Sequence, residues 1–451
     1  MKKYLILFLA FSYVGANLVH LDVLNQLVSA IVLVYILSTL PNLQGMVAKL
    51  MIVLSVLTVF FLIGQRNIWS IIHEGTHVNL AIVTIFALTP VLSIPFRTGG
   101  YMETLKSVLH KKRNQVSFFY ISTAFLTQIL GVVINVGSIS INNYLSRASN
   151  VTSPRLRANA MNRGFAGAIA WSPYFAAMAL VISHLHIEWS SLVIYAIGFA
   201  ILSFLVGFLI DWRVMREETL RLKHQTEEEE LHEQPGNKKT AKKLTELIFL
   251  LLITTGLVLA VENFSSFNMV MAIALVSILF PVIWCLVKGN WEGYKQEVKQ
   301  HLSTTIPNLQ QEISLFLMAG LFSASFVHSP WSHQLVSLFS QLFGQSAILM
   351  TITLSLIIVA AAISGLHPIV VVTILVTSID PEQINFSPQY FALTLLGSWS
   401  ISNVLSPVTA ANNLIARNLN QKLIDVSIKW NWKYGLIMLI ILPLYLYTIG
   451  I

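Results

Sequence analysis

Long apolar segments dominate this chain of 451 residues and decide what it can fold into. Hydrophobic residues make up 55% of the sequence and charged residues only 11%, whereas a soluble domain carries roughly 25% charged residues. Roughly a dozen segments are long enough to span or enter a bilayer. The sequence therefore predicts an all-α polytopic membrane protein. The segments lie near 4–20, 25–40, 47–64, 79–96, 116–141, 164–184, 190–210, 244–261, 266–288, 311–327, 346–378, 387–416 and 434–450.

The remaining composition narrows the class of protein. The single cysteine, Cys285, excludes an intramolecular disulfide and a cysteine-rich metal site. The net charge of +8 comes from Lys and Arg in short loops beside apolar segments, as the positive-inside rule expects, so we expect no nucleic-acid partner. The N-terminal stretch 1–16 has the shape of a signal peptide. Because many apolar segments follow it, we expect a retained first helix.

The distribution of Lys and Arg predicts the side of the membrane on which each loop lies. With a cytoplasmic N-terminus, the fourth apolar segment ends inside at the basic stretch 97–113. The Arg-rich stretch 147–163 should also lie inside. Segment 116–141 lies between these two basic stretches, so it should enter the membrane and return to the same side. The pattern predicts a re-entrant hairpin here.

The second half of the chain shows the mirror image of this pattern. The stretches 328–345 and 379–388, on either side of segment 346–378, contain no Lys or Arg, so both should lie outside. The chain then crosses back to the basic region 417–433, and the polar linker 211–243 also lies inside. Two hairpins that enter from opposite faces predict an inverted repeat, which is typical of many secondary transporters.

Two local matches support a duplication. The Ser-Pro pairs at 172–173 and 406–407 are 406 − 172 = 234 residues apart. Gly131 and Gly365, in the two hairpins, are also 365 − 131 = 234 residues apart. The same spacing between hairpin and following helix in both halves favours two copies of one unit.

Each Ser-Pro pair should break the helix that contains it. Proline lacks an N–H and clashes with the preceding turn, so carbonyl groups are freed. Irregular backbone inside a membrane is tolerated where it is buried in protein or lines a cavity, and its carbonyl groups can hold ions. Around the second break lies a cluster of neutral polar side chains, for which helix–helix hydrogen bonding is the alternative role. The cluster comprises Ser398, Ser400, Ser402, Asn403, Ser406, Thr409, Asn412 and Asn413.

The first break and the two hairpins offer fewer polar groups. The first break has Ser172, whereas its small residues between 164 and 168 fit close packing equally well. A histidine inside the membrane is a candidate for solute contact or proton coupling, although it can also satisfy a neighbouring backbone group. No Asp or Glu lies in the middle of the hairpins or broken helices, so we expect no carboxylate proton relay there. The hairpin candidates are Asn135, Ser138, Ser364 and His367.

The stretch HEGTH at 73–77 offers a different interpretation. His73 and His77, four residues apart with Glu74 between them, match the zinc-peptidase pattern, in which two His bind zinc and Glu acts as general base. The sequence has no recognisable companion motif for a third ligand, and the topology places 65–78 in an outside loop. A membrane zinc metalloprotease therefore stays an alternative to the transporter. The preferred interpretation is a non-enzyme with a polar loop at this position.

The architecture resembles the ion transporter superfamily, in particular the divalent anion/sodium symporters and their citrate and arsenite relatives. The resemblance covers 79–210 and 311–450 and rests on the two hairpins and the two broken helices. The Ser-Asn-Thr of the symporter hairpin tips is replaced here by NVGS at 135–138 and SGLHP at 364–368, whereas the second broken helix keeps SPVTAANN at 406–413. The resemblance implies an elevator-type carrier, a homodimer and sodium coupling.

These observations predict a secondary active transporter that moves a small anionic or polar organic solute across the cytoplasmic membrane, with Na⁺ as coupling ion and no other cofactor. A carrier of a lipid-linked anion remains a second alternative. Solute-binding candidates are Asn135, Ser138, Ser172, Ser364, His367, Ser406, Thr409, Asn412 and Asn413. Cation-binding candidates are Gly131, Asn135, Gly365, Asn403 and Ser402.

The predicted organisation follows the repeat. Membrane lipid is the expected surroundings, and the N-terminus and the linker should be cytoplasmic. Amphipathic helices are expected at 95–112 and 328–341, before the two hairpins. The predicted parts are N-terminal scaffold helices at 1–78, a first repeat core at 79–210 (hairpin about 116–141, broken helix 164–184), a linker at 211–243, scaffold helices at 244–310 and a second repeat core at 311–451 (hairpin about 346–378, broken helix 387–416).

Overall fold

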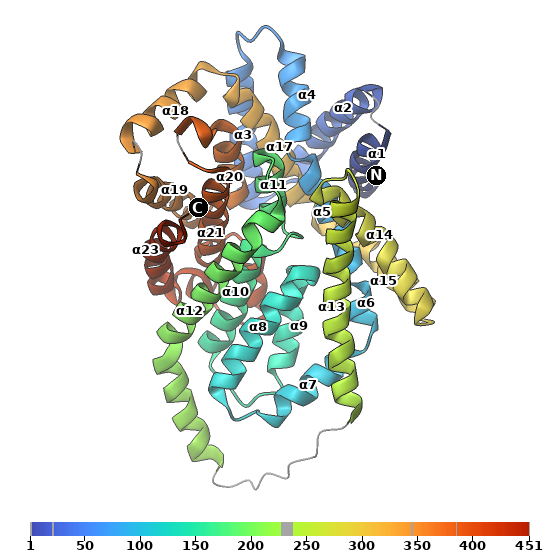
Figure 1. Ribbon diagram of the computed structural model, residues 1–451, viewed down its shortest axis with the longest axis vertical. Helices are drawn as coiled ribbons and strands as arrows, with labels where there is room; N and C mark the ends of the chain where they lie inside the picture. The colour runs from blue at the N-terminus through green and yellow to red at the C-terminus, as the bar shows by residue number, and fades with distance from the viewer. Residues whose placement is uncertain (1, 20–21, 227–237, 344–345, 385, 451) are drawn as a thin grey trace.

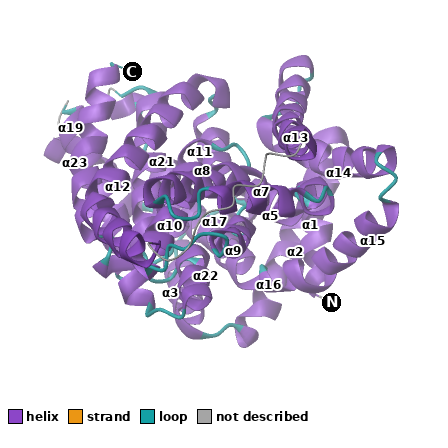
Figure 2. Ribbon diagram, turned by 90° about the horizontal axis from the view of Figure 1, so that it is seen from below, coloured by secondary structure: helices purple, strands orange, loops and turns teal. Residues whose placement is uncertain are grey.

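The computed structural model describes residues 2–19, 22–226, 238–343, 346–384 and 386–450. These residues form helices joined by loops and contain no strand (Figure 2). Within these ranges, nine helical stretches are long and apolar enough to cross a membrane, or ten if a bent pair near 310–339 is counted as one span. The chain is a multi-pass membrane protein, as its composition predicts.

The described residues of the N-terminal part, within 2–98, form six helices and one 3₁₀ turn. Apolar side chains on α1, α5 and α14 (Met269–Val287) pack against one another, and α17 (Gln310–Val327) packs against α3 and α4. The helices of this part are α1 (Lys2–Val19), α2 (Asp22–Thr39), the 3₁₀ turn Leu40–Asn42, α3 (Gly45–Leu62), α4 (Ile68–Val78), α5 (Leu80–Leu92) and α6 (Ile94–Thr98).

The central part of the chain contains the first hairpin and the first broken helix. The basic amphipathic stretch before the hairpin forms α7, which confirms the helix predicted there. The helices are α7 (Tyr101–Lys111), α8 (Val116–Ile134), α9 (Gly137–Ser146), α10 (Pro154–Trp171), α11 (Ala176–Leu185) and α12 (Trp189–Thr226).

The second half begins after the stretch 227–237, which is outside the described residues. The amphipathic stretch expected before the second hairpin also forms a helix, α18. The elements are α13 (Lys238–Phe264), α14 (Met269–Val287), α15 (Trp291–Gln300), a π-turn at His301–Thr305, α16 (Ile306–Asn308), α17 (Gln310–Val327), α18 (Pro330–Phe343), α19 (Ala347–Ile363), α20 (Pro368–Ser378), a 3₁₀ turn at Glu382–Ile384, α21 (Pro388–Leu405), α22 (Ala410–Leu419), a π-turn at Asp425–Lys429 and α23 (Trp432–Ile449).

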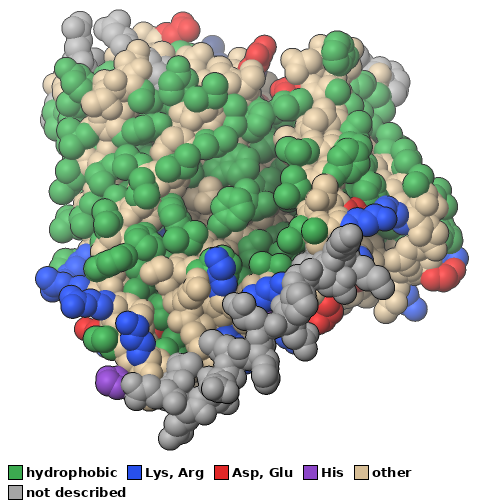
Figure 3. Space-filling view, turned by 60° about the horizontal axis from the view of Figure 1, so that its bottom comes forward, with side chains coloured by type: hydrophobic (Ala, Val, Ile, Leu, Met, Phe, Trp, Pro, Cys, Tyr) green, Lys and Arg blue, Asp and Glu red, His purple; other side chains and the backbone are tan. Residues whose placement is uncertain are grey.

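The two hairpins lie toward opposite ends of the molecule (Figure 1). The α8–α9 hairpin lies in the half that contains α7, and the α19–α20 hairpin lies in the half that contains α18. The broken helices α10 and α21 contact each other between them. A broad hydrophobic surface gives way to Lys and Arg side chains at the end beside the linker (Figure 3). Exposed basic residues include Lys111 at the end of α7, Lys112 directly after it, and Arg213 and Arg216 on α12.

The structure corrects three of the sequence-based boundaries. The outside loop expected at 65–78 is largely the helix α4, which begins at Ile68. The first broken helix begins at Pro154, ten residues before the expected start at 164, because Ser153 caps it and Pro154 suits the first helical turn. Helix α12 continues to Thr226, so the first part of the expected linker is helical.

Candidate functional site

Both broken helices are interrupted at their Ser-Pro pairs, as predicted. Helix α10 ends at Trp171 and α11 resumes at Ala176. Helix α21 ends at Leu405 and α22 resumes at Ala410. In each break the serine hydroxyl accepts a hydrogen bond from the backbone N–H two residues later, at 3.3 Å in both cases. This local turn replaces the helical bonds that proline cannot make.

The two broken helices also begin alike. Ser153 and Ser387 each cap a helix, accepting a hydrogen bond from a backbone N–H three residues later, and each is followed by proline at the first helical position. The two capping serines are 387 − 153 = 234 residues apart. The prediction rested on the Ser-Pro pairs at the two breaks. The Ser-Pro pairs that begin the two helices have the same spacing and were missed.

The hairpin tips have the unusual backbone that their sequences suggest. Asn135 ends α8 with φ of 53°, a conformation that few residues other than glycine adopt and that Asn tolerates best. Gly365, between α19 and α20, has φ of 101°, which strongly favours glycine. Both residues turn the chain within a few positions. The conformation at Asn135 costs free energy, and such strain is concentrated at functional sites.

A cavity of about 70 Å³ lies where the hairpin tips meet the helix breaks. The first tip contributes Asn135 and the second contributes His367. Asn403 and Thr409 line the cavity from the second broken helix. Four of the predicted site residues therefore lie around one space, although they come from three separate parts of the chain.

Three buried asparagine side chains around the second break have oxygen atoms without a hydrogen-bond partner: Asn162, Asn403 and Asn412. The side-chain NH₂ group of Asn412 donates to the carbonyl oxygens of Asn403, Val404 and Ser406 at 2.9, 3.2 and 2.8 Å. That of Asn162 donates to Val404 at 3.2 Å. The amides thus bind carbonyl groups at the break, and their own oxygens remain available as acceptors.

The other predicted site residues are not among those that line the cavity. Ser138, Ser172 and Ser406 are fully buried. Ser364 and Asn413 are exposed, and each donates to a backbone carbonyl of its own turn. Among the cation candidates, the Gly131 carbonyl accepts from Asn135 N–H at 2.9 Å, and the Ser402 carbonyl accepts from Ser406 N–H at 2.9 Å. Their roles in binding stay predictions.

One lining residue was missed by the sequence analysis. Glu312 lies in the first turn of α17 and lines the cavity together with Phe316, one turn further along the same helix. The expectation that no carboxylate lies near the site considered only the hairpins and broken helices. Helix α17 packs against α20, and this tertiary contact brings Glu312 to the cavity.

The HEGTH stretch is a helix with packing and hydrogen-bonding roles. His73 Nδ1 lies 2.8 Å from Ser29 Oγ, and His77 Nδ1–H donates to the His73 carbonyl oxygen at 2.8 Å. A Cβ atom on Gly75 would lie 2.8 Å from the Leu321 Cα of α17, so only glycine permits this helix crossing. In the part of the chain that the structure describes, no group of three or more His, Cys, Asp or Glu side chains is placed to hold a metal ion.

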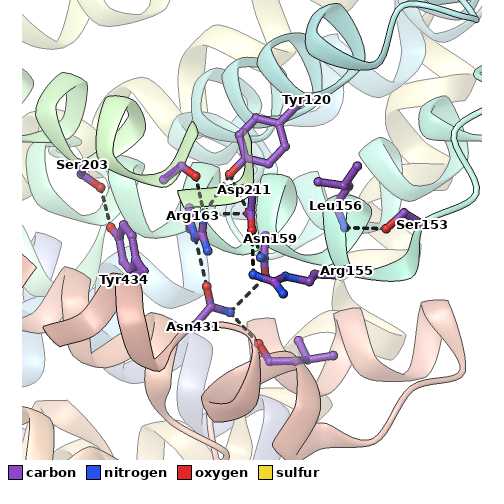
Figure 4. A network of polar contacts seen from close by, with 12 residues as sticks. Tyr120, Ser153, Arg155, Leu156, Asn159, Arg163, Ser203, Asp211, Asn431 and Tyr434 are labelled. Carbon is purple, nitrogen blue, oxygen red and sulfur yellow. Dashed lines mark hydrogen bonds and ion pairs between the residues drawn. The ribbon is translucent and has the colours of Figure 1, made fainter. Parts of the chain in front are cut away.

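A buried ionic network fixes the first broken helix in place (Figure 4). Arg163 on α10 donates to Asp211 on α12 at 2.8 Å and to Tyr120 on α8 at 3.0 Å. Arg163 also donates to the Gly207 carbonyl oxygen at 2.7 Å and to Asn431, just before α23, at 3.0 Å. Hairpin, broken helix and α12 are thereby tied together. Asp211 is the first residue of the linker expected at 211–243, but its side chain is fully buried.

Comparison with known proteins identifies the fold but not a family. No family model matches the chain, and no curated protein matches it by sequence. The fold is similar to that of the YdaH transporter of Alcanivorax borkumensis, whose crystal structure has an unusual topology. The TM-score is 0.50 and the sequence identity is 16%, with 81% of this chain and 86% of the YdaH chain covered. The chain therefore shares its fold with a transporter.

Proposed function

We propose that this protein is an elevator-type secondary active transporter that carries a small polar organic solute across the cytoplasmic membrane, coupled to Na⁺. The cavity between hairpin tips and helix breaks is the proposed binding site. The similarity to the YdaH transporter supports the transporter fold, and the chemistry of the site rests on this chain's own residues. The elevator motion and a homodimeric state rest on the resemblance to the ion transporter superfamily.

The observation that carries the proposal is the pairing of the residues around the cavity. Five pairs of lining residues are separated by the same 234 positions as the two breaks, for example 403 − 169 = 234. The pairs are Phe165 with Trp399, Ile169 with Asn403, Phe175 with Thr409, Ala176 with Ala410, and Ala177 with Ala411.

A direct contact between equivalent residues supports the same symmetry. Ser400 Oγ donates to the Ala166 carbonyl oxygen at 2.7 Å, and these residues are also 400 − 166 = 234 positions apart. A residue touches its own equivalent only beside a two-fold axis. We infer that the chain is an inverted repeat whose pseudo-two-fold axis passes beside the cavity, the arrangement in which many transporters bind solute.

The lining favours a polar solute over an anionic one. Asn135, His367, Asn403 and Thr409 offer amide, imidazole and hydroxyl groups for hydrogen bonds. The lining residues include Glu312 and neither Lys nor Arg, so an anion would meet no cationic partner. The same lining gives a lipid-linked anion no cation to bind.

Sodium would bind at the second break in this proposal. Na⁺ binds to oxygen atoms, and unwound backbone carbonyl groups commonly supply them in transporters. The unpartnered amide oxygens of Asn403 and Asn412 add neutral acceptors of the right kind. The first break is poorer, because its equivalents of these residues are Ile169 and Met178. We propose one cation site, on the second half of the chain.

The proposed orientation places the N-terminus and the linker region 211–243 in the cytoplasm. Exposed basic residues lie on α7 and on the C-terminal part of α12, which are at the same end of the molecule (Figure 1), as the positive-inside rule expects for a cytoplasmic face. A protease-accessibility assay on sealed vesicles tests this orientation. A linker cleaved only in inside-out vesicles supports it.

The test of sodium coupling is thermal stability of the purified protein in NaCl, LiCl and KCl at constant ionic strength. We expect stabilisation by Na⁺ over K⁺, lost in Asn412→Ala and retained in Glu74→Ala, because Glu74 lies away from the cavity on α4 and contacts His328. Equal stability in all three salts would refute sodium binding. Zinc that co-purifies and is lost in His73→Ala would instead support the protease.

A further inference from the structure

The central cavity combines one carboxylate with a high density of aromatic rings. Of the residues that line it, Glu312 is the acidic one, and the aromatic ones are Phe86, Phe165, Phe175, Phe316 and Trp399. Aromatic faces and a carboxylate together are the groups that recognise an organic cation, because the ring quadrupole and the carboxylate both attract positive charge. The same groups offer nothing to an anion.

Four of the aromatic rings form two edge-to-face pairs, one from α5 and α17 and one from α10 and the first break. Phe86 on α5 and Phe316 on α17 pack edge to face with centroids 5.0 Å apart. Phe165 on α10 and Phe175 in the first break pack edge to face with centroids 5.4 Å apart. The centroid of the His367 ring lies 5.8 Å from that of the Phe316 ring. Edge-to-face pairing fixes the rings in place, so the cavity is preorganised.

Among the residues that the structure describes, none forms an ion pair with Glu312. Its side chain is half-buried, and among the described residues it makes no hydrogen bond and no ion pair. Its place in the first turn of α17 puts the carboxyl group near the positive end of the helix dipole. An ionised carboxylate among aromatic rings is costly unless a cation accompanies it. A positive group bound beside Glu312 would remove this cost.

A second hydrogen-bond acceptor lines the cavity from another helix. Asn403 lines the cavity and is 7% exposed, and its side-chain oxygen has no hydrogen-bond partner. An acceptor without a donor suits a cation or an N–H group. Glu312 and Asn403 come from α17 and α21, two elements on different parts of the fold, so the two acceptors converge on one space from separate walls.

We propose that the solute carries an organic ammonium group, and that this group binds between Glu312 and the aromatic pairs. The inference rests on the proposed transport function and names the class of its substrate. The ammonium group neutralises Glu312. The rings of Phe86 and Phe316 replace part of the hydration shell of the ammonium group. The side-chain amides of Asn135 and Asn403 bind the polar remainder of the solute.

The experiment titrates the purified protein with choline and with 3,3-dimethylbutan-1-ol, its neutral isostere, and follows thermal stability at pH 7.5. Choline should stabilise the wild type and the isostere should not. Glu312→Gln keeps the size of the side chain and removes its charge, and it should weaken choline binding at least tenfold. Phe86→Leu, which keeps apolar volume, should weaken it by several-fold. The matched control Glu74→Gln, on a carboxylate outside this cavity, should bind choline as the wild type does.

Three results would overturn the proposal. The first is equal stabilisation by choline and its isostere, and the second is unchanged choline affinity in Glu312→Gln. The third is stabilisation by succinate or benzoate that strengthens in Glu312→Gln. Phe86→Leu keeps the test valid if Glu312→Gln fails to fold.

Flux measurements in proteoliposomes separate this inference from the transport function. Transport of an anion that survives Glu312→Gln would keep the carrier and overturn the ammonium site. Binding of choline that depends on Glu312, without flux of any solute, would support the site and overturn the carrier.

Discussion

Replacing Asp211 should be among the most damaging single substitutions in this protein. The side chain of Asp211 is fully buried and that of its partner Arg163 is 2% exposed. Asp211 also accepts hydrogen bonds from Asn159 at 2.8 Å and from Arg155 at 3.1 Å. Asp211→Asn removes the charge while keeping the shape, and leaves Arg163 buried without a carboxylate.

The magnitude follows from the loss of one partner in a buried pair. Such a loss typically costs about 3–5 kcal/mol, because the remaining charge stays desolvated. Arg163 keeps four other interactions: hydrogen bonds to the Gly207 carbonyl oxygen at 2.7 Å, to Asn431 at 3.0 Å and to Tyr120 at 3.0 Å, and a cation–π contact 4.8 Å from the ring centroid of Tyr434. These interactions still stabilise the buried guanidinium group. We therefore expect Asp211→Asn to lower the free energy of unfolding by about 3 kcal/mol, at the lower end of this range. The double variant Arg163→Met with Asp211→Leu should recover part of this loss, because no buried charge remains.

The assay is reversible unfolding in mixed micelles of dodecyl maltoside and SDS, followed by far-UV circular dichroism. The matched control is Glu292→Gln, which removes an exposed ion pair with Lys295 and should cost less than about 0.5 kcal/mol. A free energy of unfolding for Asp211→Asn within about 1 kcal/mol of the wild type would refute the argument that this pair fixes α10.

Three further predictions concern packing, the second break and pH. Gly164→Ala should destabilise the protein by about 1–3 kcal/mol, because a Cβ atom there would lie 2.3 Å from the Ala124 carbonyl oxygen; Gly256→Ala, with open space around its Cβ, should be neutral or stabilising in the same unfolding assay. Asn412→Ala removes an amide that binds three carbonyl groups and should cost about 1–3 kcal/mol, measured as a lower melting temperature; an unchanged value would contradict its role at the break. Burial lowers the pKa of His301, so the unfolded chain binds the proton first and the free energy of unfolding should fall as pH drops below about 6.5. His301→Gln should flatten the dependence of melting temperature on pH between about 5 and 7. A curve parallel to that of the wild type would contradict this.

The positions of the breaks could be predicted because their cause is local. Proline cannot continue a helix and restricts the residue before it, so Trp171 and Leu405 end their helices immediately before the Ser-Pro pairs. The start of α10 is equally local, since Ser153 and Pro154 form a helix-start signal. The predicted start was wrong because it was placed where the apolar run begins, ten residues later.

The cavity could be predicted only in part, because its membership is decided by packing between distant segments. Asn135, His367, Asn403 and Thr409 were found from polarity near a break or a tip. Glu312 lies in a polar stretch that resembles any helix entry, and only the packing of α17 against α20 brings it to the cavity. The predicted site contained no acidic side chain, whereas the observed lining contains Glu312.

The unequal chemistry of the paired cavity residues has a consequence for how a solute can sit. On a perfect two-fold axis, a solute would have two poses of equal energy. Here one half supplies Ile169 and Phe175 where the other supplies Asn403 and Thr409. One hydrogen bond that is satisfied in only one pose is worth about 1 kcal/mol, and about 1.4 kcal/mol would populate that pose ten to one. For a solute bound at the proposed axis, the divergence of the paired residues would therefore favour one orientation across the membrane.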